Sequence, residues 1–248
     1  MGPRPGREQL EREHFDRLAE QTEEIWWGST TEAGRQRLRR RAHLIAAALE
    51  RFQDPRVLEV GCGTGALTLP LLEERPALRL CAFDISPRSI EVAAGRAAPF
   101  ANAKVRIGNA LDFDAEDGAF DAVVGNSVLH HLPLEPFVAE AHRLLRPGGL
   151  LWFSEPNMLN PQIAVEKNVK PIGRLLQNTP DETAFLRWPL ATRLRRAGFS
   201  RVEVRPYDFL HPIVPASLIG AVSKLGALFE LLPLVREISG SLIVHAIK

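Results

Sequence analysis

The chain has 248 residues, in which 31 lysines and arginines nearly balance 30 aspartates and glutamates. That balance argues against a strong overall field of the kind that draws a protein to nucleic acid or to a membrane. The two cysteines, Cys62 and Cys81, form no CxxC pair, which argues against a disulfide framework or a zinc site and favours a reducing compartment. The N-terminal residues lack the apolar core of a signal peptide, so we expect a cytoplasmic protein.

Two amphipathic helices are predicted first, over Arg12–Ile25 and Arg35–Phe52, because apolar residues recur there at helical spacing. Asp54-Pro55 ends the second helix. Five arginines lie in this second helix, at positions 35, 37, 39, 40 and 41. They spread around much of its circumference, so we interpret them as a solvated face rather than as a nucleic-acid contact.

Short apolar runs alternate with amphipathic segments between residues 56 and 154. The runs predict strands at Arg56–Val60, Arg79–Phe83, Lys104–Ile107, Phe120–Asn126 and Gly149–Ser154. The amphipathic segments predict helices at Ala66–Glu74, Ser86–Ala98 and Glu135–Leu145. This alternation is typical of an α/β fold, in which helices cover both faces of a parallel sheet.

The pattern loosens after Glu155, and residues 156–182 show no sustained period. Beyond them we predict a helix at Pro189–Ala197 and strands at Arg201–Phe209 and Ser241–Ile247, which enclose an apolar helical insert at residues 212–240. No repeat or long linker is visible. We therefore expect one domain, with a helical cap at 1–53, a core at 54–155 and further insertions at 156–248.

The turn after the first predicted strand reads "EVGCGTG", with glycines at positions 61, 63 and 65 and Glu59 two residues before them. A dinucleotide site uses the spacing G-x-G-x-x-G and holds pyrophosphate at the helix N-terminus. A carboxylate beside that turn repels pyrophosphate but suits a ligand with an ammonium or sulfonium group. S-adenosylmethionine (SAM) carries both and has no phosphate, so the charge favours SAM.

Five segments in order, "VLEVGCGTG", "FDIS", "GNALDF", "FDAVVGNSVLHHL" and "LLRPGGLLWFSEP", resemble the class I SAM-dependent methyltransferases, in particular the small-molecule, type 11-like subgroup. The resemblance implies a doubly wound, mostly parallel sheet of seven strands, with SAM as methyl donor and S-adenosylhomocysteine as product. It also implies cofactor contacts at Glu59, Gly61, Cys62, Gly63, Gly65, Asp84, Ile85, Asn109, Ala110, Gly125 and Asn126.

The same resemblance implies a role for several of these side chains. Glu59 would orient the amino end of the cofactor, Asp84 would accept both ribose hydroxyls, and Ile85 would pack on the adenine. Asn109 stands where the family usually has an aspartate, but an amide oxygen is able to accept the same hydrogen bond from the adenine amino group. Asn126, with Gly125, would face the methionine part.

Candidate catalytic and substrate-binding residues follow the fourth and fifth predicted strands. His130 and His131 are able to deprotonate a hydroxyl at neutral pH, and the alternative is that they shape the pocket. Glu155 and Asn157 are candidates for substrate contact, as is Trp27, whose alternative role is aromatic packing. We expect no metal site.

The sequence "GNSV" occupies the place where enzymes that methylate DNA bases at exocyclic amines carry a proline-proline-aromatic motif, so we expect no nucleic-acid substrate. The apolar insert is interpreted as a lid or dimer helix, or as a peripheral membrane contact that admits a lipidic acceptor. The prediction is a methyltransferase acting on a small-molecule or lipid-linked acceptor, preferably at oxygen. A catalytically silent SAM-binding regulatory or scaffold subunit and a nicotinamide oxidoreductase are the alternatives.

Overall fold

The computed structural model describes residues 7–21, 29–176 and 182–248. At its centre lies a seven-stranded sheet with the order β3-β2-β1-β4-β5-β7-β6. The strands are β1 (Arg56–Val60), β2 (Arg79–Asp84), β3 (Ala103–Ile107), β4 (Phe120–Asn126), β5 (Leu145–Pro156), β6 (Ser200–Tyr207) and β7 (Ser241–Ile247). The first five strands are parallel, and β7 runs antiparallel to both of its neighbours. The predicted doubly wound, mostly parallel sheet is confirmed.

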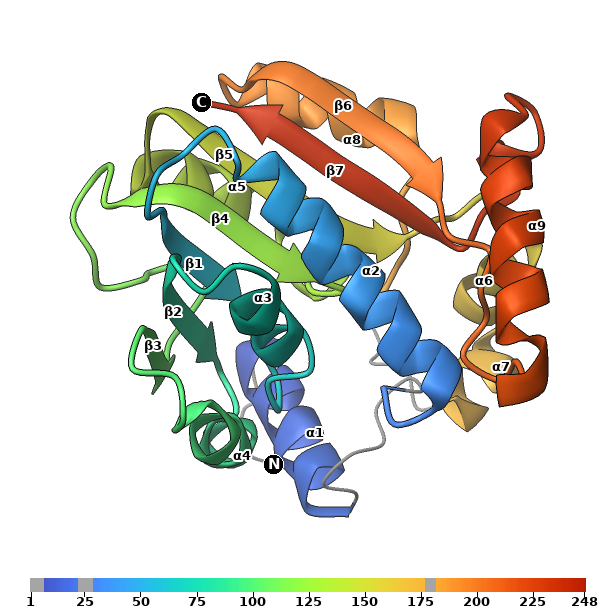
Figure 1. Ribbon diagram of the computed structural model, residues 1–248, viewed down its shortest axis with the longest axis horizontal. Helices are drawn as coiled ribbons and strands as arrows, with labels where there is room; N and C mark the ends of the chain where they lie inside the picture. Colours follow the sequence, from blue (N-terminus) through green and yellow to red (C-terminus); the bar gives the residue numbers. More distant parts are fainter. Residues whose placement is uncertain (1–6, 22–28, 177–181) are drawn as a thin grey trace, which may run out of the picture.

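Helices cover both faces of this sheet (Figure 1). One layer consists of α2 (Glu32–Ala48), α3 (Thr68–Glu74) and α4 (Pro87–Ala97), and the other of α5 (Leu134–Leu144) and α8 (Arg187–Arg196). Successive residues of β1 point to opposite faces, so Val57 enters the first core and Leu58 the second. Burial on both sides explains why the central strands are almost continuously apolar.

Side-chain caps start two of these helices. Ser86 Oγ accepts a hydrogen bond from Ser89 N at 3.0 Å, and Pro87 supplies a backbone angle that suits the first turn of α4. Thr31 Oγ1 accepts one from Gly34 N at 3.0 Å at the start of α2. The cap of α4 follows directly on the carboxyl end of β2, which fixes the helix start at that edge of the sheet.

The strand order reverses between β1 and β4, because β1 pairs with β2 on one side and with β4 on the other. The connections that follow β1 and β4 therefore leave toward opposite faces and open a crevice at the carboxyl ends of the strands. Open α/β sheets bind their ligands at such a point. α1 (Arg7–Gln21) lies beside α4, where Asp16 Oδ1 accepts a hydrogen bond from Ser86 Oγ at 2.6 Å.

The structure adds elements that the sequence pattern did not predict. Within residues 156–182 it forms α6 (Pro161–Asn168) and α7 (Lys170–Leu175). Glu166 is the one buried residue of α6, so this helix has no apolar period, and it begins instead from the Asn160 side chain. The apolar insert at residues 212–240, by contrast, was predicted to be helical, and it contains α9 (Ile219–Leu231). Among the described residues, no helix combines the length and apolar character needed to cross a membrane.

Helix bounds differ from the prediction mainly near the N-terminus. The helix expected at Arg12–Ile25 is α1, which starts earlier, and the end of the predicted range lies outside the described residues. The helix expected at Arg35–Phe52 is α2, which ends earlier, at Ala48. It also begins earlier, at Glu32, because the Thr31 side chain caps its first turn.

Gly125 in β4 tests the packing of the sheet. A Cβ there would lie 2.4 Å from Phe153 Cε1, so we expect Gly125→Ala to lower the free energy of unfolding by about 1–3 kcal/mol. Gly95 is exposed in α4 and a Cβ there meets nothing within 4 Å, so Gly95→Ala should raise that free energy by about 0.5–1 kcal/mol. Urea denaturation of both variants measures the difference, and an equal effect at the two positions would contradict this packing.

Candidate functional site

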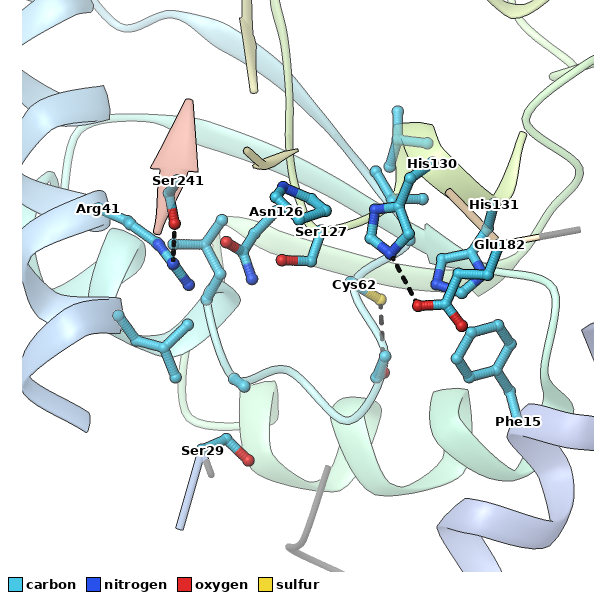
Figure 2. Close-up of a pocket in the computed structure, with 18 of the residues that line it drawn as sticks. Phe15, Ser29, Arg41, Cys62, Asn126, Ser127, His130, His131, Glu182 and Ser241 are labelled. Atoms are coloured by element: carbon cyan, nitrogen blue, oxygen red, sulfur yellow. Dashed lines mark hydrogen bonds and ion pairs between the residues drawn. The ribbon is translucent and has the colours of Figure 1, made fainter. Parts of the chain in front are cut away.

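A cavity of about 950 Å³ opens at the carboxyl ends of β1, β2 and β4 (Figure 2). Its walls come from the turns that follow these strands, from α1 and α2, and from residues 208–213 after β6. Its size falls in the range of roughly 300–1,000 Å³ that holds a small ligand. The strand-order reversal predicts a ligand site here, and the cavity lies at that place.

The glycine turn after β1 forms one wall. Gly61, Gly63 and Gly65 have φ values of +64°, +52° and +87°, a region that side chains disfavour. Gly61 is also fixed by packing, since a Cβ there would lie 2.5 Å from Val128 Cγ2. At Gly63 a Cβ would meet nothing within 4 Å, and this residue lines the cavity. The turn therefore presents bare backbone to a ligand, while Gly65 lies behind it.

Glu59, at the end of β1, lines the same cavity although it is 1% exposed. Its Oε2 accepts a hydrogen bond from Thr68 Oγ1 at 2.8 Å. Burial, together with the negative charge of Asp84, raises the pKa of Glu59 to about 8 against the effect of that bond. No cation among the described residues pairs with this carboxyl group, which suits a cationic ligand.

Asp84 ends β2 on the next wall of the cavity. Its Oδ2 accepts a hydrogen bond from Gly63 N and its Oδ1 accepts one from Ser86 N, both at 2.9 Å. Burial raises its pKa above the ordinary value, and these backbone bonds counteract that effect. The carboxylate is thus held rigidly at the cavity, with Ile85 lining the wall beside it.

Asn109 and Ala110 line the cavity after β3. Asn109 Oδ1 accepts a hydrogen bond from Leu111 N at 2.9 Å, which closes an Asx turn. The oxygen keeps a second lone pair, so the turn role and the predicted ligand role are compatible.

Asn126 presents a polar side chain to the cavity. Its Oδ1 is buried, lines the cavity and has no hydrogen-bond partner among the residues that the structure describes. The next residue, Ser127, has φ +54°, a conformation uncommon outside glycine. An orphaned acceptor, a bare glycine turn and two buried acids together fit the ammonium, hydroxyl and amino donors of SAM.

His130 lies in a short turn after β4 and is held by two carboxylates. Its Nδ1 is 2.7 Å from Glu155 Oε2, and its Nε2 is 3.6 Å from Glu182 Oε1. Burial by itself would lower the pKa of His130, but the hydrogen bonds to Glu155 and Glu182 outweigh it and raise the pKa to about 9. Glu155 also accepts backbone hydrogen bonds from Val128 and Leu129, which fixes the dyad.

His131 differs from its neighbour in charge. Its Nδ1 lies 3.2 Å from Glu11 Oε2 of α1, and its ring meets the edge of Phe15. Burial, followed by the positive charge of His130, lowers the pKa of His131. At neutral pH the pair is therefore one imidazolium and one neutral imidazole, and both line the cavity.

His130, His131 and Glu182 bring three potential metal ligands within 4.8 Å of one another. Glu182, however, also forms an ion pair with Lys167, and His130 carries a proton at neutral pH. Burial would raise the pKa of Glu182, but its contacts with the histidines and Lys167 lower it to about 2. These charges describe a proton and ion-pair network, so we assign no metal to it.

Several predicted site residues lie elsewhere. Gly125 does not line the cavity, because its missing side chain makes room for Phe153. Glu155 is 1% exposed and holds His130 rather than reaching the cavity. Asn157 is equally buried, and its Nδ2 donates to the carbonyl oxygens of Glu237 and Ser239, so it supports the chain instead of a substrate. Trp27 lies outside the described residues.

Cys62 lines the cavity and belongs to the core next to α2, and burial raises the pKa of its thiol well above the ordinary value. It is thus a packing residue with its backbone at the site.

The arginines of α2 correct the sequence interpretation. Arg41 is 6% exposed, and both Arg37 and Arg41 line the cavity rather than forming a solvated face. Their spacing of four residues, next to apolar Leu38 and Ala42, was the signal that they lie on the buried side. Glu11 and Glu182 were also missed, since neither stands in a motif.

Comparison with known proteins gives a family. Residues 57–149 match the model of the methyltransferase domain family. The malonyl-[acyl-carrier protein] O-methyltransferase of Geobacter sulfurreducens is 32% identical over 187 residues, covering 72% of this chain and 68% of that protein. The demethylmenaquinone methyltransferase of Geobacillus stearothermophilus is 30% identical over 174 residues, which cover 62% of this chain and 74% of that protein. The erythromycin 3''-O-methyltransferase of Saccharopolyspora erythraea is 31% identical, but this chain spans 56% of its length.

Solved structures share the fold. A SAM-dependent methyltransferase of Thermotoga maritima, described as a possible histamine N-methyltransferase, superposes with a TM-score of 0.64 at 19% identity, covering 95% of this chain and 99% of that one. The phosphoethanolamine N-methyltransferase 2 of Haemonchus contortus, solved with SAM, superposes with a TM-score of 0.58 at 16% identity. The match covers 83% of this chain and 52% of that one. From the fold, the family match and these relatives, the chain belongs to the SAM-dependent methyltransferases and uses SAM as its methyl donor.

Proposed function

We propose that this enzyme transfers the methyl group of SAM to an oxygen atom of a small-molecule or lipid-linked acceptor, with His130 as the general base. The observation that carries the proposal is the position of His130 on the wall of the cavity, in the turn that follows Asn126, with its Nδ1 2.7 Å from the buried Glu155 Oε2. The orientation of His130 by a buried carboxylate is the arrangement that a base needs.

The proposed cofactor position follows the cavity walls. Glu59 receives the ammonium group, the backbone of Gly61, Cys62 and Gly63 lies against the ligand, and Asp84 accepts the ribose hydroxyls. Ile85, Asn109 and Ala110 surround the adenine, and Asn126 Oδ1 gains its missing partner. We no longer assign Gly65 and Gly125 contacts of their own, because neither lines the cavity.

SAM supplies a methyl carbon that the sulfonium charge already activates, so positioning and removal of the acceptor proton are left to the protein. Glu155 is paired with Nδ1 of His130, so Nε2 is the ring nitrogen that faces Glu182 and the cavity. In the free protein the two carboxylates keep this ring protonated. A sulfonium bound nearby opposes the imidazolium charge, so we expect the base form to gain population in the complex.

The acceptor is inferred from two observations. Two of the similar relatives are named O-methyltransferases, which supports oxygen as the methylated atom. The cavity is lined by Ile213 and Leu176, which are 80% and 38% exposed. Outside the cavity wall, further apolar side chains remain exposed in α9 and in the residues on either side of it. These are Leu218, Leu225, Leu228, Leu231, Leu232, Leu234 and Ile238. An apolar rim of this kind supports a lipidic acceptor and a peripheral membrane contact, with a homodimer as the competing explanation.

Transfer from SAM with an isotopically labelled methyl group into host extract tests the proposal. We expect label in the lipid or small-metabolite fraction, reduced about 100-fold or more in His130→Ala because a general base is lost. His43→Ala is the matched control, since His43 is exposed and pairs with Glu74 outside the cavity. Asp84→Ala should abolish SAM binding while the protein stays folded.

Label in protein or RNA would overturn the acceptor class. SAM binding without any transfer would instead favour a silent binding subunit. Full activity of His130→Ala would remove the base from the mechanism even if the acceptor is as proposed.

The charge of His130 can be measured without an acceptor. We expect its ring to titrate near pH 9 in the free protein, in NMR spectra of labelled histidine assigned with His130→Gln. Glu182→Gln should lower this midpoint because it removes one stabilising carboxylate, and SAM should lower it more than S-adenosylhomocysteine, which has no sulfonium charge. A midpoint at or below the ordinary value of about 6.5 would contradict the arrangement.

A further inference from the structure

We propose that Arg37 and Arg41 form a carboxylate-binding subsite in the cavity, on the side of Asn126 away from the histidines. Figure 2 shows Arg41 with Ser241 on one side of Asn126 and the two histidines on the other. The carboxylate belongs either to the methionine part of SAM or to the acceptor. Assigning it to an acceptor rests on the proposed function, whereas the binding of a carboxylate does not.

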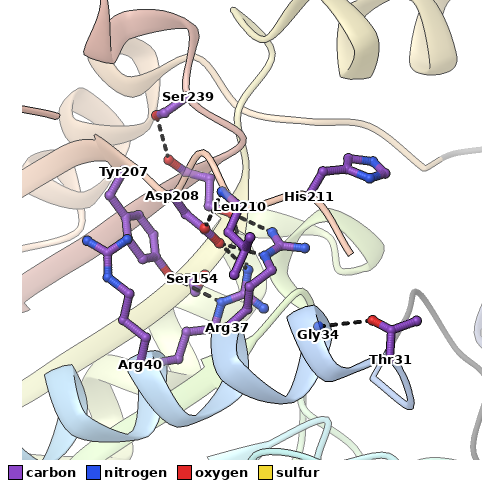
Figure 3. Close-up of polar contacts among 12 residues, drawn as sticks. Thr31, Gly34, Arg37, Arg40, Ser154, Tyr207, Asp208, Leu210, His211 and Ser239 are labelled. Atoms are coloured by element: carbon purple, nitrogen blue, oxygen red, sulfur yellow. Dashed lines mark hydrogen bonds and ion pairs between the residues drawn. The ribbon is translucent and has the colours of Figure 1, made fainter. Parts of the chain in front are cut away.

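Both arginines form an ion pair with one acid, Asp208. Figure 3 shows Arg37 and Asp208 among the polar contacts of this region. Arg37 Nε lies 2.7 Å from Asp208 Oδ2, and Arg41 Nη2 lies 3.4 Å from the same oxygen. The Nη2 atoms donate to Ser241 Oγ, at 3.5 Å from Arg37 and 3.2 Å from Arg41. Arg41 Nε donates to Tyr207 OH at 3.2 Å. The guanidinium groups are thus held side by side at the ends of β6 and β7.

The charges at this place do not balance. Two guanidinium groups share the single carboxylate of Asp208, and their side chains are 17% and 8% exposed. Burial, followed by the charge of Arg41, lowers the pKa of Arg37. Burial would also lower the pKa of Arg41, but Tyr207, Asp208 and Glu155 outweigh it and raise that pKa, so the shortage of negative charge falls on Arg37. Arg40, on the same helix, has an acid of its own, with both terminal nitrogens on Glu230 at 2.8 and 2.7 Å. A buried positive charge without its own anion is costly, and a bound carboxylate removes that cost.

Donor atoms remain for such a ligand. Within the part of the chain that the structure describes, neither Arg37 Nη1 nor Arg41 Nη1 makes a hydrogen bond. Both residues line the cavity. Glu155 is near enough to affect the pKa of Arg41, but its oxygens are taken by His130 and by the backbone of Val128 and Leu129. Paired guanidinium groups with free donors fit a carboxylate closely.

The acid that anchors them is itself held in a strained backbone. Asp208 has φ +74°, a conformation that costs free energy in a residue with a side chain. It is fixed by its Oδ1, which accepts from Leu210 N at 3.2 Å, and by its own N, which donates to Glu230 Oε1 at 2.9 Å. Strain maintained by so many contacts is typical of a functional position, and here it aims the carboxylate at both arginines.

Calorimetric titration separates the two sources of the carboxylate. S-adenosylhomocysteine and its decarboxylated analogue, 5′-S-(3-aminopropyl)thioadenosine, are titrated into three proteins: the unaltered protein, Arg37→Gln and Arg40→Gln. If the carboxylate is that of the cofactor, Arg37→Gln weakens S-adenosylhomocysteine binding about 10- to 100-fold and leaves the analogue unchanged. Arg40→Gln, whose partner is Glu230, should bind both as the unaltered protein does.

If the carboxylate is that of the acceptor, Arg37→Gln leaves S-adenosylhomocysteine binding unchanged. The protein saturated with S-adenosylhomocysteine should then bind octanoate or malonate, and Arg37→Gln should lose that binding. If Arg37→Gln binds S-adenosylhomocysteine, its decarboxylated analogue, octanoate and malonate as the unaltered protein does, the proposal is overturned. If Arg37→Gln does not fold, Arg37→Lys keeps the charge but loses the forked geometry and should show the same loss in part. Because these readouts need no turnover, they stand whether or not methyl transfer to oxygen is found.

Discussion

Glu59, a buried carboxyl group at the end of β1 with no cationic partner in the part of the chain that the structure describes, is the constraint on which the site depends. The strand-order reversal between β1 and β4 puts it at the floor of the cavity, where burial raises its pKa to about 8. The fold therefore maintains an acid that is mostly neutral in the free protein and that a cationic ligand would ionise. The glycine turn, Asp84 and Asn126 line the same cavity, and Asn126 Oδ1 has no hydrogen-bond partner among the described residues.

Three groups of charged side chains can be distinguished around the cavity, and Glu11, Glu166, Glu182 and Asp208 add carboxylates outside the first of them. Acids line the side of β1 and β2, two arginines that share one aspartate lie toward β6 and β7, and the His130–Glu155 dyad lies after β4. A donor that is cationic at its amino and sulfonium groups and anionic at its carboxylate matches this order. It is also consistent with the proposed base role of His130, because the positive sulfonium of a bound donor disfavours the protonated form of the imidazole.

Much of the fold and of the cofactor wall was predictable from the sequence, because β1, β4 and β7 are apolar runs with clear breakers and the glycine turn requires glycine. The features that the sequence did not predict depend on tertiary contacts. α6 has no apolar period and begins from the Asn160 cap alone. Arg37 and Arg41 lie on the cavity side of α2 because they pair with Asp208, which follows β6. The Asn157 side chain donates to carbonyl groups about eighty residues later in the chain. Glu155 was expected to contact the substrate. That it holds His130 is visible only from the 2.7 Å distance between Glu155 Oε2 and His130 Nδ1. The cofactor contacts themselves stay predictions.

The most direct test of the central claim is the number of protons released when SAM binds at pH 7, measured by calorimetry in buffers of different ionisation enthalpy. Glu59→Gln provides the reference and cancels the titration of SAM itself. With a pKa of about 8 in the free protein, Glu59 should release close to one proton that Glu59→Gln does not, and SAM affinity should rise with pH up to that value. Equal proton release in the two proteins would mean that Glu59 does not receive the ammonium group, and would contradict the proposed placement of SAM.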